Sequence, residues 1–277
     1  MHTISSKEQI DWYERHLHTG LRAAGWYIQE GLKNELGYKP DFPEFSWLQS
    51  SLLKPAFQHL CFRYKNQIFS ILMAFVQNND AYILQQDFDN QIRESKKYNL
   101  IPCIIPLRAD NYEPLVGGYQ LIKSDDGSII DVAELSSDTL IEMSNWEILD
   151  MGIQIVKDDI LKQGWKILSY CNVPGIEPQI WFEKNNGQRC YVVVSASKAC
   201  LEKDKPLNIN MYSQLKDYMG YYAKVSFWDL DYLGAHIDDG SKHLYRGHGL
   251  GINYKGLETI EKAAINTGAN NDDIFTV

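Results

Sequence analysis

Histidine and aspartate residues crowd the segment from residue 236 to residue 248 and are the side chains best suited to bind a metal ion. They are His236, Asp238, Asp239, His243 and His248. Imidazole and carboxylate groups are common ligands of divalent cations. However, their spacing matches no recognised zinc pattern, and the run from Asp238 to Ser241 is also a good turn sequence. We therefore interpret this segment as a turn and predict no metal site.

Basic side chains gather in the same part of the chain. They are Lys242, His243, Arg246, His248 and Lys255. Because the chain carries a formal net charge of −9, this local positive charge is the best candidate for binding an anionic ligand or a partner. Solvated surface charge is the commoner reason for such a cluster, and that alternative stays open here.

The composition predicts a cytoplasmic protein. No apolar run approaches the roughly 20 residues that span a bilayer, and Met1 to Leu17 is too polar for a secretory signal. The pI of about 5.3 argues against a nonspecific grip on nucleic acid, although a local basic groove would still allow one. The five cysteines form no CxxC or CxxH pair, so we interpret them as reduced core residues.

The stretch from Pro178 to Lys198 predicts the centre of a sheet. Ile180-Trp181-Phe182 and the run from Cys190 to Val194 favour extended backbone, and Asn186-Gly187 between them suits a tight hairpin. The valine run does not alternate with polar residues, so both of its faces should be covered. We therefore expect a central strand with helices on both sides of the sheet.

Other elements follow from periodicity and turn residues. The clearest helix runs from Ser144 through Gly164, where Ser144 and Glu147 form a capping box. We also expect helices from residue 5 or 6 to Gly25 or on to Glu35, around residues 88–98, over 210–219 and over 257–265. Strands are expected over residues 60–64, 68–76, 100–107, 117–122, 129–132, 165–170, 223–230 and 244–253.

Two parts of the chain repeat the same order of elements. Each begins with a helix that leads to a Gly-Trp pair, Gly25-Trp26 or Gly164-Trp165, and continues with a hairpin, a helix and a strand. The sequence thus predicts an α/β protein of two similar halves, residues 1–137 and 138–265, each a mixed sheet flanked by helices, with a loose tail at 266–277. The alternative is that any two αβ units share such a rhythm.

The order of helix, three strands, helix and strand over residues 145–230 is similar to the core of the PD-(D/E)XK, or restriction-endonuclease-like, superfamily. The resemblance implies an acidic residue after Pro on the second strand and Glu-x-Lys on the third. The two carboxylates hold a divalent cation, and the Lys assists the nucleophile or the developing charge. Here Gln179 follows Pro178, and Ser195-Ala196-Ser197 stands in place of Glu-x-Lys, with Lys198 one residue out of register. In the first half, Met73-Ala74-Phe75 takes the equivalent place. The resemblance therefore implies a degenerate site at Gln179, Ser195 and Ser197.

Three functions fit these observations. The leading hypothesis is a non-catalytic binding or scaffold protein without a cofactor, whose partner is another protein or a second copy of the chain. The second is a divergent Mg²⁺-dependent nuclease that draws on Glu147, Glu177, Glu183 and Lys198. In that case Glu147 has a competing role as the residue that completes a helix cap. The third is a small-ligand binder that uses a cleft between the halves.

Overall fold

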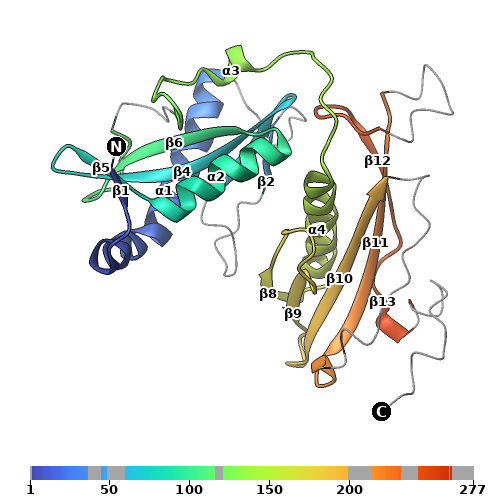
Figure 1. Cartoon of the computed structure of the whole chain (residues 1–277). Helices are drawn as coiled ribbons and strands as arrows, with labels where there is room; N and C mark the ends of the chain where they lie inside the picture. The colour runs from blue at the N-terminus through green and yellow to red at the C-terminus, as the bar shows by residue number, and fades with distance from the viewer. Residues whose placement is uncertain are drawn as a thin grey trace. The chain divides into compact units, whose positions relative to one another are not determined.

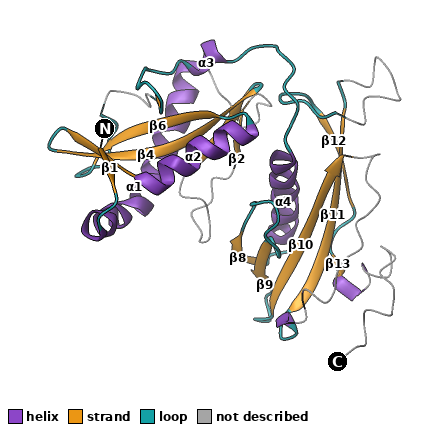
Figure 2. Cartoon of the chain, viewed as in Figure 1, coloured by secondary structure: helices purple, strands orange, loops and turns teal. Residues whose placement is uncertain are grey.

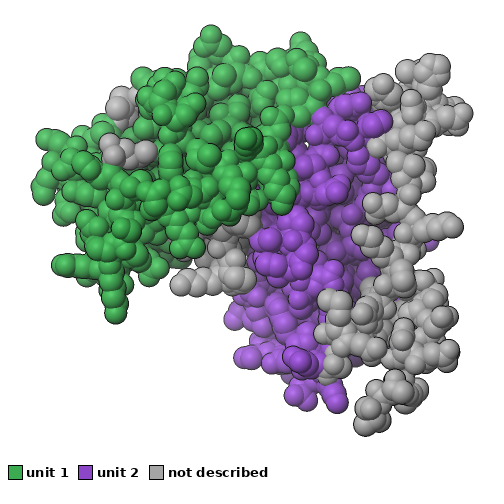
Figure 3. Space-filling model, viewed as in Figure 1, with its two compact units in different colours: residues 1–52, 56–141 green, residues 53–55, 142–277 purple. Residues whose placement is uncertain are grey.

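The computed structural model describes residues 2–36, 45–48, 60–115, 121–198, 212, 214–231, 243–261 and 263. The described residues form two compact units that divide after residue 141 (Figure 3). The sequence placed this boundary slightly earlier, after residue 137. Lys242, the predicted turn from Asp238 to Ser241 and the predicted tail at 266–277 lie outside the described residues. No helix in the described parts of the chain combines the length and the apolar composition that a membrane-spanning helix needs.

The first unit contains a long helix, a mixed sheet and a second helix. Its elements are β1 (His2–Ile4), α1 (Lys7–Leu36), β2 (Phe45–Leu48), β3 (Leu60–Tyr64), β4 (Gln67–Gln77), β5 (Asp80–Leu84), α2 (Gln85–Tyr98), β6 (Ile101–Arg108), β7 (Ile122–Lys123) and α3 (Val132–Leu135). The first helix does not stop at Gly25 but continues to Leu36. The sequence did not predict β1 and β5.

The first sheet is built around β4. Strand β4 pairs antiparallel with β3 and β5 and parallel with β6, while β2 pairs with β3, β7 pairs with β6, and β1 pairs with β5. Met73 and Phe75 pack into the cluster that includes α1 residues, whereas Leu72 and Ala74 pack with Phe88 of α2. Because successive strand residues face opposite sides, the two helices cover opposite faces of the sheet (Figure 2).

The second unit begins with a capped helix and also contains one mixed sheet. Its elements are α4 (Asn145–Lys162), β8 (Lys166–Tyr170), β9 (Ile180–Glu183), β10 (Arg189–Lys198), β11 (Met219–Asp229), β12 (Leu250–Tyr254) and β13 (Glu258–Thr259). The predicted capping box of Ser144 and Glu147 is present, with both side chains bonded to the expected backbone amides. Within the described residues, part of the predicted helix over 257–265 is β13, and the predicted strand over 244–253 begins only at Leu250.

Strand β10 lies at the centre of the second sheet, as predicted. The order is β12-β11-β10-β9-β8, with β10 and β11 parallel and the other neighbours antiparallel. Both faces of β10 are buried: Val192 and Val194 pack with residues of α4, and Tyr191 and Val193 pack with Tyr222 and Ile260. Figure 1 shows α4 alongside β10. The unbroken valine run therefore marks a strand that is covered on both sides.

The two units share one sequence of pairings, which supports the predicted duplication. In each unit a helix is followed by three antiparallel strands, then by a strand parallel to the third, and then by an antiparallel one. These strands are β2-β3-β4-β6-β7 in the first unit and β8-β9-β10-β11-β12 in the second. The first unit adds β5 and β1, which extend the sheet beyond the end of β3.

A glycine at each helix crossing fixes how the two central strands correspond. A Cβ atom on Gly20 of α1 would lie 2.5 Å from the Phe75 ring, and one on Gly152 of α4 would lie 2.7 Å from Ala196 Cβ. Side chains facing the helix are thus Met73 and Phe75 in β4, and Val194 and Ala196 in β10. The predicted equivalence of Met73-Ala74-Phe75 with the run from Ser195 to Ser197 is therefore wrong by one residue.

Candidate functional site

Charged side chains of the second unit gather where β10 and β11 end. Parallel strands that end together often form binding sites at their carboxyl ends. Residues 142 and 143, just before α4, lie against the loop formed by residues 243–249. The Met143 amide donates to the Leu244 carbonyl at 2.7 Å, and Glu142 forms an isolated antiparallel bridge with Tyr245. This contact brings the loop to the first turn of α4.

A buried ion pair holds the loop to the helix. Arg246 Nε and Nη2 donate to the two carboxylate oxygens of Glu147, each at 2.8 Å, and both side chains are 1% exposed. Glu147 Oε2 also accepts hydrogen bonds from the amide and hydroxyl of Ser144. The negative charge of Glu147 is compensated by Arg246, and its oxygens are occupied by these donors. Glu147 is therefore a structural residue of the helix start.

A second group of side chains lies at the end of β11. Asp229 Oδ2 is 2.7 Å from His248 Nδ1, and Asp231 follows two residues after Asp229. The ligand atoms of these three residues lie within 4.8 Å of one another, and among the described residues no other group of this kind occurs. Each carboxylate also accepts a main-chain hydrogen bond, from Asp231 N to Asp229 and from Gly249 N to Asp231. The group has the donor set for a divalent cation, and it is also a hydrogen-bonded turn.

A third contact joins the end of β10 to the loop. Lys198 Nζ donates to Glu142 Oε1, and His243 Nδ1 lies 3.1 Å from the same oxygen. The hydrogen bond from Lys198 lowers the pKa of Glu142 most, and His243 lowers it further. Glu142 is half exposed, so solvent screens this charge.

The predicted basic cluster is not a free positive surface. His243 faces Glu142, Arg246 is bound by Glu147 and His248 faces Asp229, so three of its members each meet a carboxylate. Lys255 is exposed, and Lys242 lies outside the described residues. The carboxylates come from distant parts of the chain, and their charge offsets that of the cluster. An anion would have to displace them.

The expected degenerate site lies on the strands around Gln179. Gln179 is 3% exposed, and its Oε1 accepts a hydrogen bond from the Val194 amide at 2.8 Å. The main-chain amide of Gln179 donates to the Val192 carbonyl at 3.0 Å. Ser195 and Ser197 alternate with Val194 and therefore face away from α4. The side chain of Gln179 thus completes a strand contact.

Lys198 lies on the α4 face of β10, in line with Val194 and Ala196. The alternation of the strand and the contact of Lys198 with Glu142, just before α4, both place it there. The other two carboxylates of the nuclease hypothesis, Glu177 and Glu183, have separate partners. Tyr212 donates to Glu177, and Arg189 lies 3.9 Å from Glu183. The structure does not bring Glu147, Glu177 and Glu183 into one group of ligand atoms among the described residues.

Asp229 and Asp231 were not among the residues singled out from the sequence. The signal was present, because Asp229 and Asp231 are two residues apart and come directly after the strand-like run from Ala223 to Trp228. A pair of this kind at a strand end is a common source of ligands. Their partner His248 was recognised, both among the candidate metal ligands of residues 236–248 and in the basic cluster, but it was not connected with Asp229 and Asp231.

Aromatic side chains fill the corresponding end of the first unit. Trp12 and His16 of α1 surround Phe75, with ring centroids 6.3 Å and 5.6 Å from it. His16 Nδ1 lies 2.9 Å from the hydroxyl of Tyr112, whose ring also contacts Phe75. Burial, and then the positive charge of Arg15, lowers the pKa of His16. This end is therefore a packed aromatic cluster.

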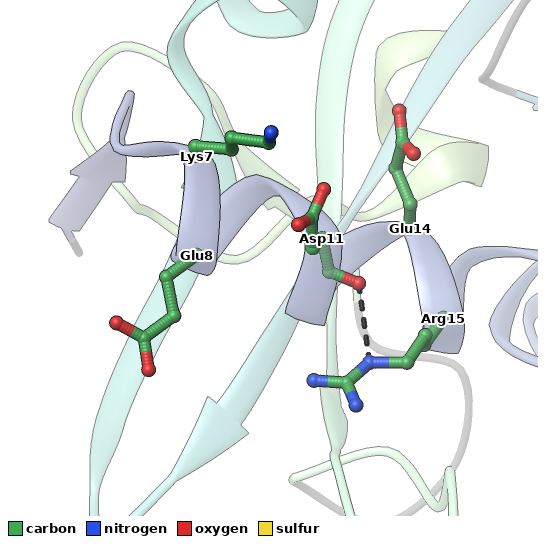
Figure 4. A pocket seen from close by; sticks show the side chains of 5 residues that line it. All are labelled: Lys7, Glu8, Asp11, Glu14 and Arg15. Carbon is green, nitrogen blue, oxygen red and sulfur yellow. Dashed lines mark hydrogen bonds between the residues drawn. The ribbon is translucent and has the colours of Figure 1, made fainter.

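A shallow depression of about 710 Å³ lies along the first turns of α1. It is lined by Lys7, Glu8, Asp11, Glu14 and Arg15. Figure 4 shows these side chains leaving the helix in different directions, with Arg15 Nε bonded to the Asp11 carbonyl at 3.2 Å. They converge on no common point. The predicted ligand cleft between the two halves stays a prediction.

Comparison with known proteins adds one finding. The model of a family described as "Domain of unknown function (DUF8840)" matches residues 146–260, from the first turn of α4 to the residue after β13. No curated protein and no solved structure matches the chain. The match falls within the second unit.

Proposed function

We propose that this chain is a non-catalytic binding protein whose second unit is a nuclease-like core that lacks the carboxylates of the family's metal site. The order of α4, β8, β9, β10 and β11 follows the order that the sequence resemblance implies, except for the helix predicted over residues 210–219. The described part of that range contains only short turns before β11 begins at Met219. A core of this kind needs carboxylates on its second and third strands to hold a cation. The proposal rests on what stands in those positions.

The observation that carries the proposal is the role of Gln179. Its side-chain oxygen is occupied by the Val194 amide in a buried setting. A neutral amide group binds Mg²⁺ poorly without carboxylates beside it. Because removing Gln179 would leave a buried amide without an acceptor, the residue supports the fold in this place.

The neighbouring strand offers no carboxylate either. On the α4 face, β10 presents Val194, Ala196 and Lys198, and on the other face Ser195 and Ser197. The helix carboxylate, Glu147, is held by Arg246. A nuclease that used Glu147, Glu177, Glu183 and Lys198 with Mg²⁺ would first have to break these separate contacts. We therefore favour binding to a protein partner or to a second copy of the chain.

A paired assay tests the proposal. The full chain is titrated with MgCl₂ and MnCl₂ by calorimetry and incubated with plasmid DNA and single-stranded RNA under the same conditions. We expect no cleavage with either cation. Cation binding by itself, if it is lost in Asp229→Asn, would belong to the group at the end of β11 and leave the proposal standing.

Cleavage would overturn the proposal if it depends on the proposed carboxylates. The informative variant is Glu177→Ala, and the matched control is Asp158→Ala, which removes an exposed carboxylate from α4. Activity that is lost in the first variant and kept in the second would identify a metal-dependent nuclease.

A further inference from the structure

Strand β10 extends beyond the end of its neighbour β9. The described pairing of these strands runs from Arg189 with Glu183 to Val192 with Ile180. Beyond that point the Val194 amide donates to the side chain of Gln179. Strand β10 continues to Lys198, paired in parallel with β11. The last part of β10 thus has a strand on only one side among the described residues.

The main-chain groups on the other side can be assigned. Val192 accepts from the Gln179 amide and Val194 donates to the Gln179 side chain, so both point their main-chain groups toward β9. In an extended strand, alternate residues direct these groups to the same edge. Ala196 and Lys198 therefore point their amides and carbonyls to this edge, where none of the described strands pairs with them.

The first unit shows what occupies the same edge. Strand β4 also runs past its neighbour β3, and at the gap the Tyr13 hydroxyl donates to the Met73 carbonyl at 2.8 Å. Beyond the gap, Phe75 and Gln77 pair with Tyr82 and Asp80 of β5. Phe75 corresponds to Ala196 through the glycine crossings, and two residues on, Gln77 corresponds to Lys198.

We propose that the edge of β10 at Ala196 and Lys198 docks an extended segment of a protein partner, antiparallel to β10, as β5 docks on β4. This inference rests on the proposed binding function and names the kind of partner. Adding a strand to a sheet edge gains its affinity from main-chain hydrogen bonds and its specificity from alternate side chains. An unpaired edge is a ready template for such a strand.

The side chains around this edge define the partner segment. A residue opposite Ala196 would share the α4 face, where Ala196 is much smaller than Phe75 of the first unit. The edge can therefore accept a large apolar side chain there. A residue opposite Lys198 would meet a lysine that is 20% exposed and already donates to Glu142. Because an ammonium group has three donors, this position still favours a carboxylate. The partner segment thus carries an acidic residue two positions before an aromatic one.

Strand β5 itself has this pattern and supplies the probe. Asp80 and Tyr82 are spaced by two, and in the first unit they face Gln77 and Phe75. A synthetic peptide of residues 78–84 would place Asp80 opposite Lys198 and Tyr82 opposite Ala196. The control peptide carries N-methyl tyrosine at position 82, which removes one main-chain donor and keeps the side chain.

Amide exchange of the isotope-labelled full chain tests the proposal. In the free chain we expect the amides of Ala196 and Lys198 to exchange at least about tenfold faster than those of Ser195 and Ser197, which face β11. The peptide at about 1 mM should slow the two fast amides and shift their resonances, and the N-methylated peptide should not. Lys198→Glu should weaken binding about fivefold, while Lys166→Glu, an exposed lysine of β8, should not.

Three results would overturn the proposal. They are equal protection of the amides of residues 195–198 in the free chain, no perturbation of Ala196 and Lys198 by the peptide, and equal binding of both peptides. Nuclease activity would instead overturn the binding function. Absence of both activity and peptide binding would leave a binding protein that uses a different surface.

Discussion

The same end of the same fold is filled in opposite ways in the two units. In the first unit, the ends of β4 and β6 are closed by the rings of Trp12, His16, Phe75 and Tyr112. In the second unit, the corresponding end is occupied by paired carboxylates and bases, with Arg246 and Glu147 at its buried centre. The comparison teaches that the topology does not dictate the chemistry at this end, because side chains alone set it.

The units also differ in how the central strand is finished. Just past the end of its antiparallel neighbour, each central strand is hydrogen-bonded by a side chain, β4 by Tyr13 and β10 by Gln179. Only in the first unit is the remaining edge covered by described strands, β5 and then β1. In the first unit the edge of β4 beyond β3 is thus paired, whereas the edge of β10 beyond β9 has no strand among the described residues, and we propose that it binds a partner.

The largest effect is expected from breaking the charged centre. Glu147→Ala leaves the Arg246 guanidinium buried without its carboxylate and removes half of the capping box. We expect the free energy of unfolding of the second unit to fall by about 3–5 kcal/mol from the lost pair and about 1 kcal/mol more from the cap. Urea denaturation followed by tryptophan fluorescence measures the change. The double variant Glu147→Leu with Arg246→Leu should recover much of the lost stability. A loss of under about 1 kcal/mol in Glu147→Ala would mean that the ion pair does not stabilise this end of the second unit.

Breaking the aromatic end should cost slightly less. Phe75→Ala opens a cavity among buried rings, and we expect the free energy of unfolding of the first unit to fall by about 3–5 kcal/mol. The same measurement serves as the test. The matched variant is Phe75→Leu, which keeps most of the volume and should lose less. Equal losses for both would mean that ring packing contributes little at this end.

A smaller effect compares the two side chains that bridge the gaps. Tyr13→Phe leaves the Met73 carbonyl without its donor, and Gln179→Ala leaves the Val194 amide without its acceptor. Each should reduce the free energy of unfolding of its own unit by about 1–3 kcal/mol. Amide exchange at Val194 should accelerate in Gln179→Ala. If Val194 stays protected, another acceptor replaces Gln179 and the correspondence between the units weakens.

The smallest effect concerns pH and belongs to the first unit. Burial, and then the negative charge of Glu14, raises the pKa of Asp87 to about 6, and Asp87 Oδ2 is buried without a hydrogen-bond partner. Because the folded state binds this proton more tightly than the unfolded chain does, the free energy of unfolding should rise as pH falls from about 7 to about 4. Asp87→Asn should remove this rise, and Asp89→Asn, its exposed neighbour, should keep it. A wild-type profile that is flat between pH 7 and 4 would be the contrary result.

Much of the second unit follows from local sequence signals. The capping box of Ser144 and Glu147 defines the start of α4, and the unbroken run from Cys190 to Val194 defines a central strand. Both signals act over a few residues, where propensity and turn chemistry are strong. In the first unit β1 and β5 were missed, because strands of three and five residues depend on pairing with distant segments.

The candidate site depended on information that the sequence does not carry. The sequence could not tell which residues of β10 face α4, because a strand buried on both faces lacks the alternation of apolar and polar residues that tells one face from the other. The sequence therefore placed Lys198 out of register with Ser195 and Ser197 but could not tell that Lys198 is the residue on the α4 face. Arg246 was interpreted as an anion-binding residue because its partner lies 99 positions away in the chain. Pairing across such a distance is set by the fold.

The glycine in the middle of each long helix has a consequence for finding relatives. Gly20 and Gly152 sit where a Cβ atom would strike the central strand, so any chain that keeps this helix-to-sheet spacing needs a very small residue there. A sequence profile that requires such a residue in the helix, followed by a hairpin and a strand covered on both sides, should detect single copies of this module. Such copies would show whether this module also exists alone.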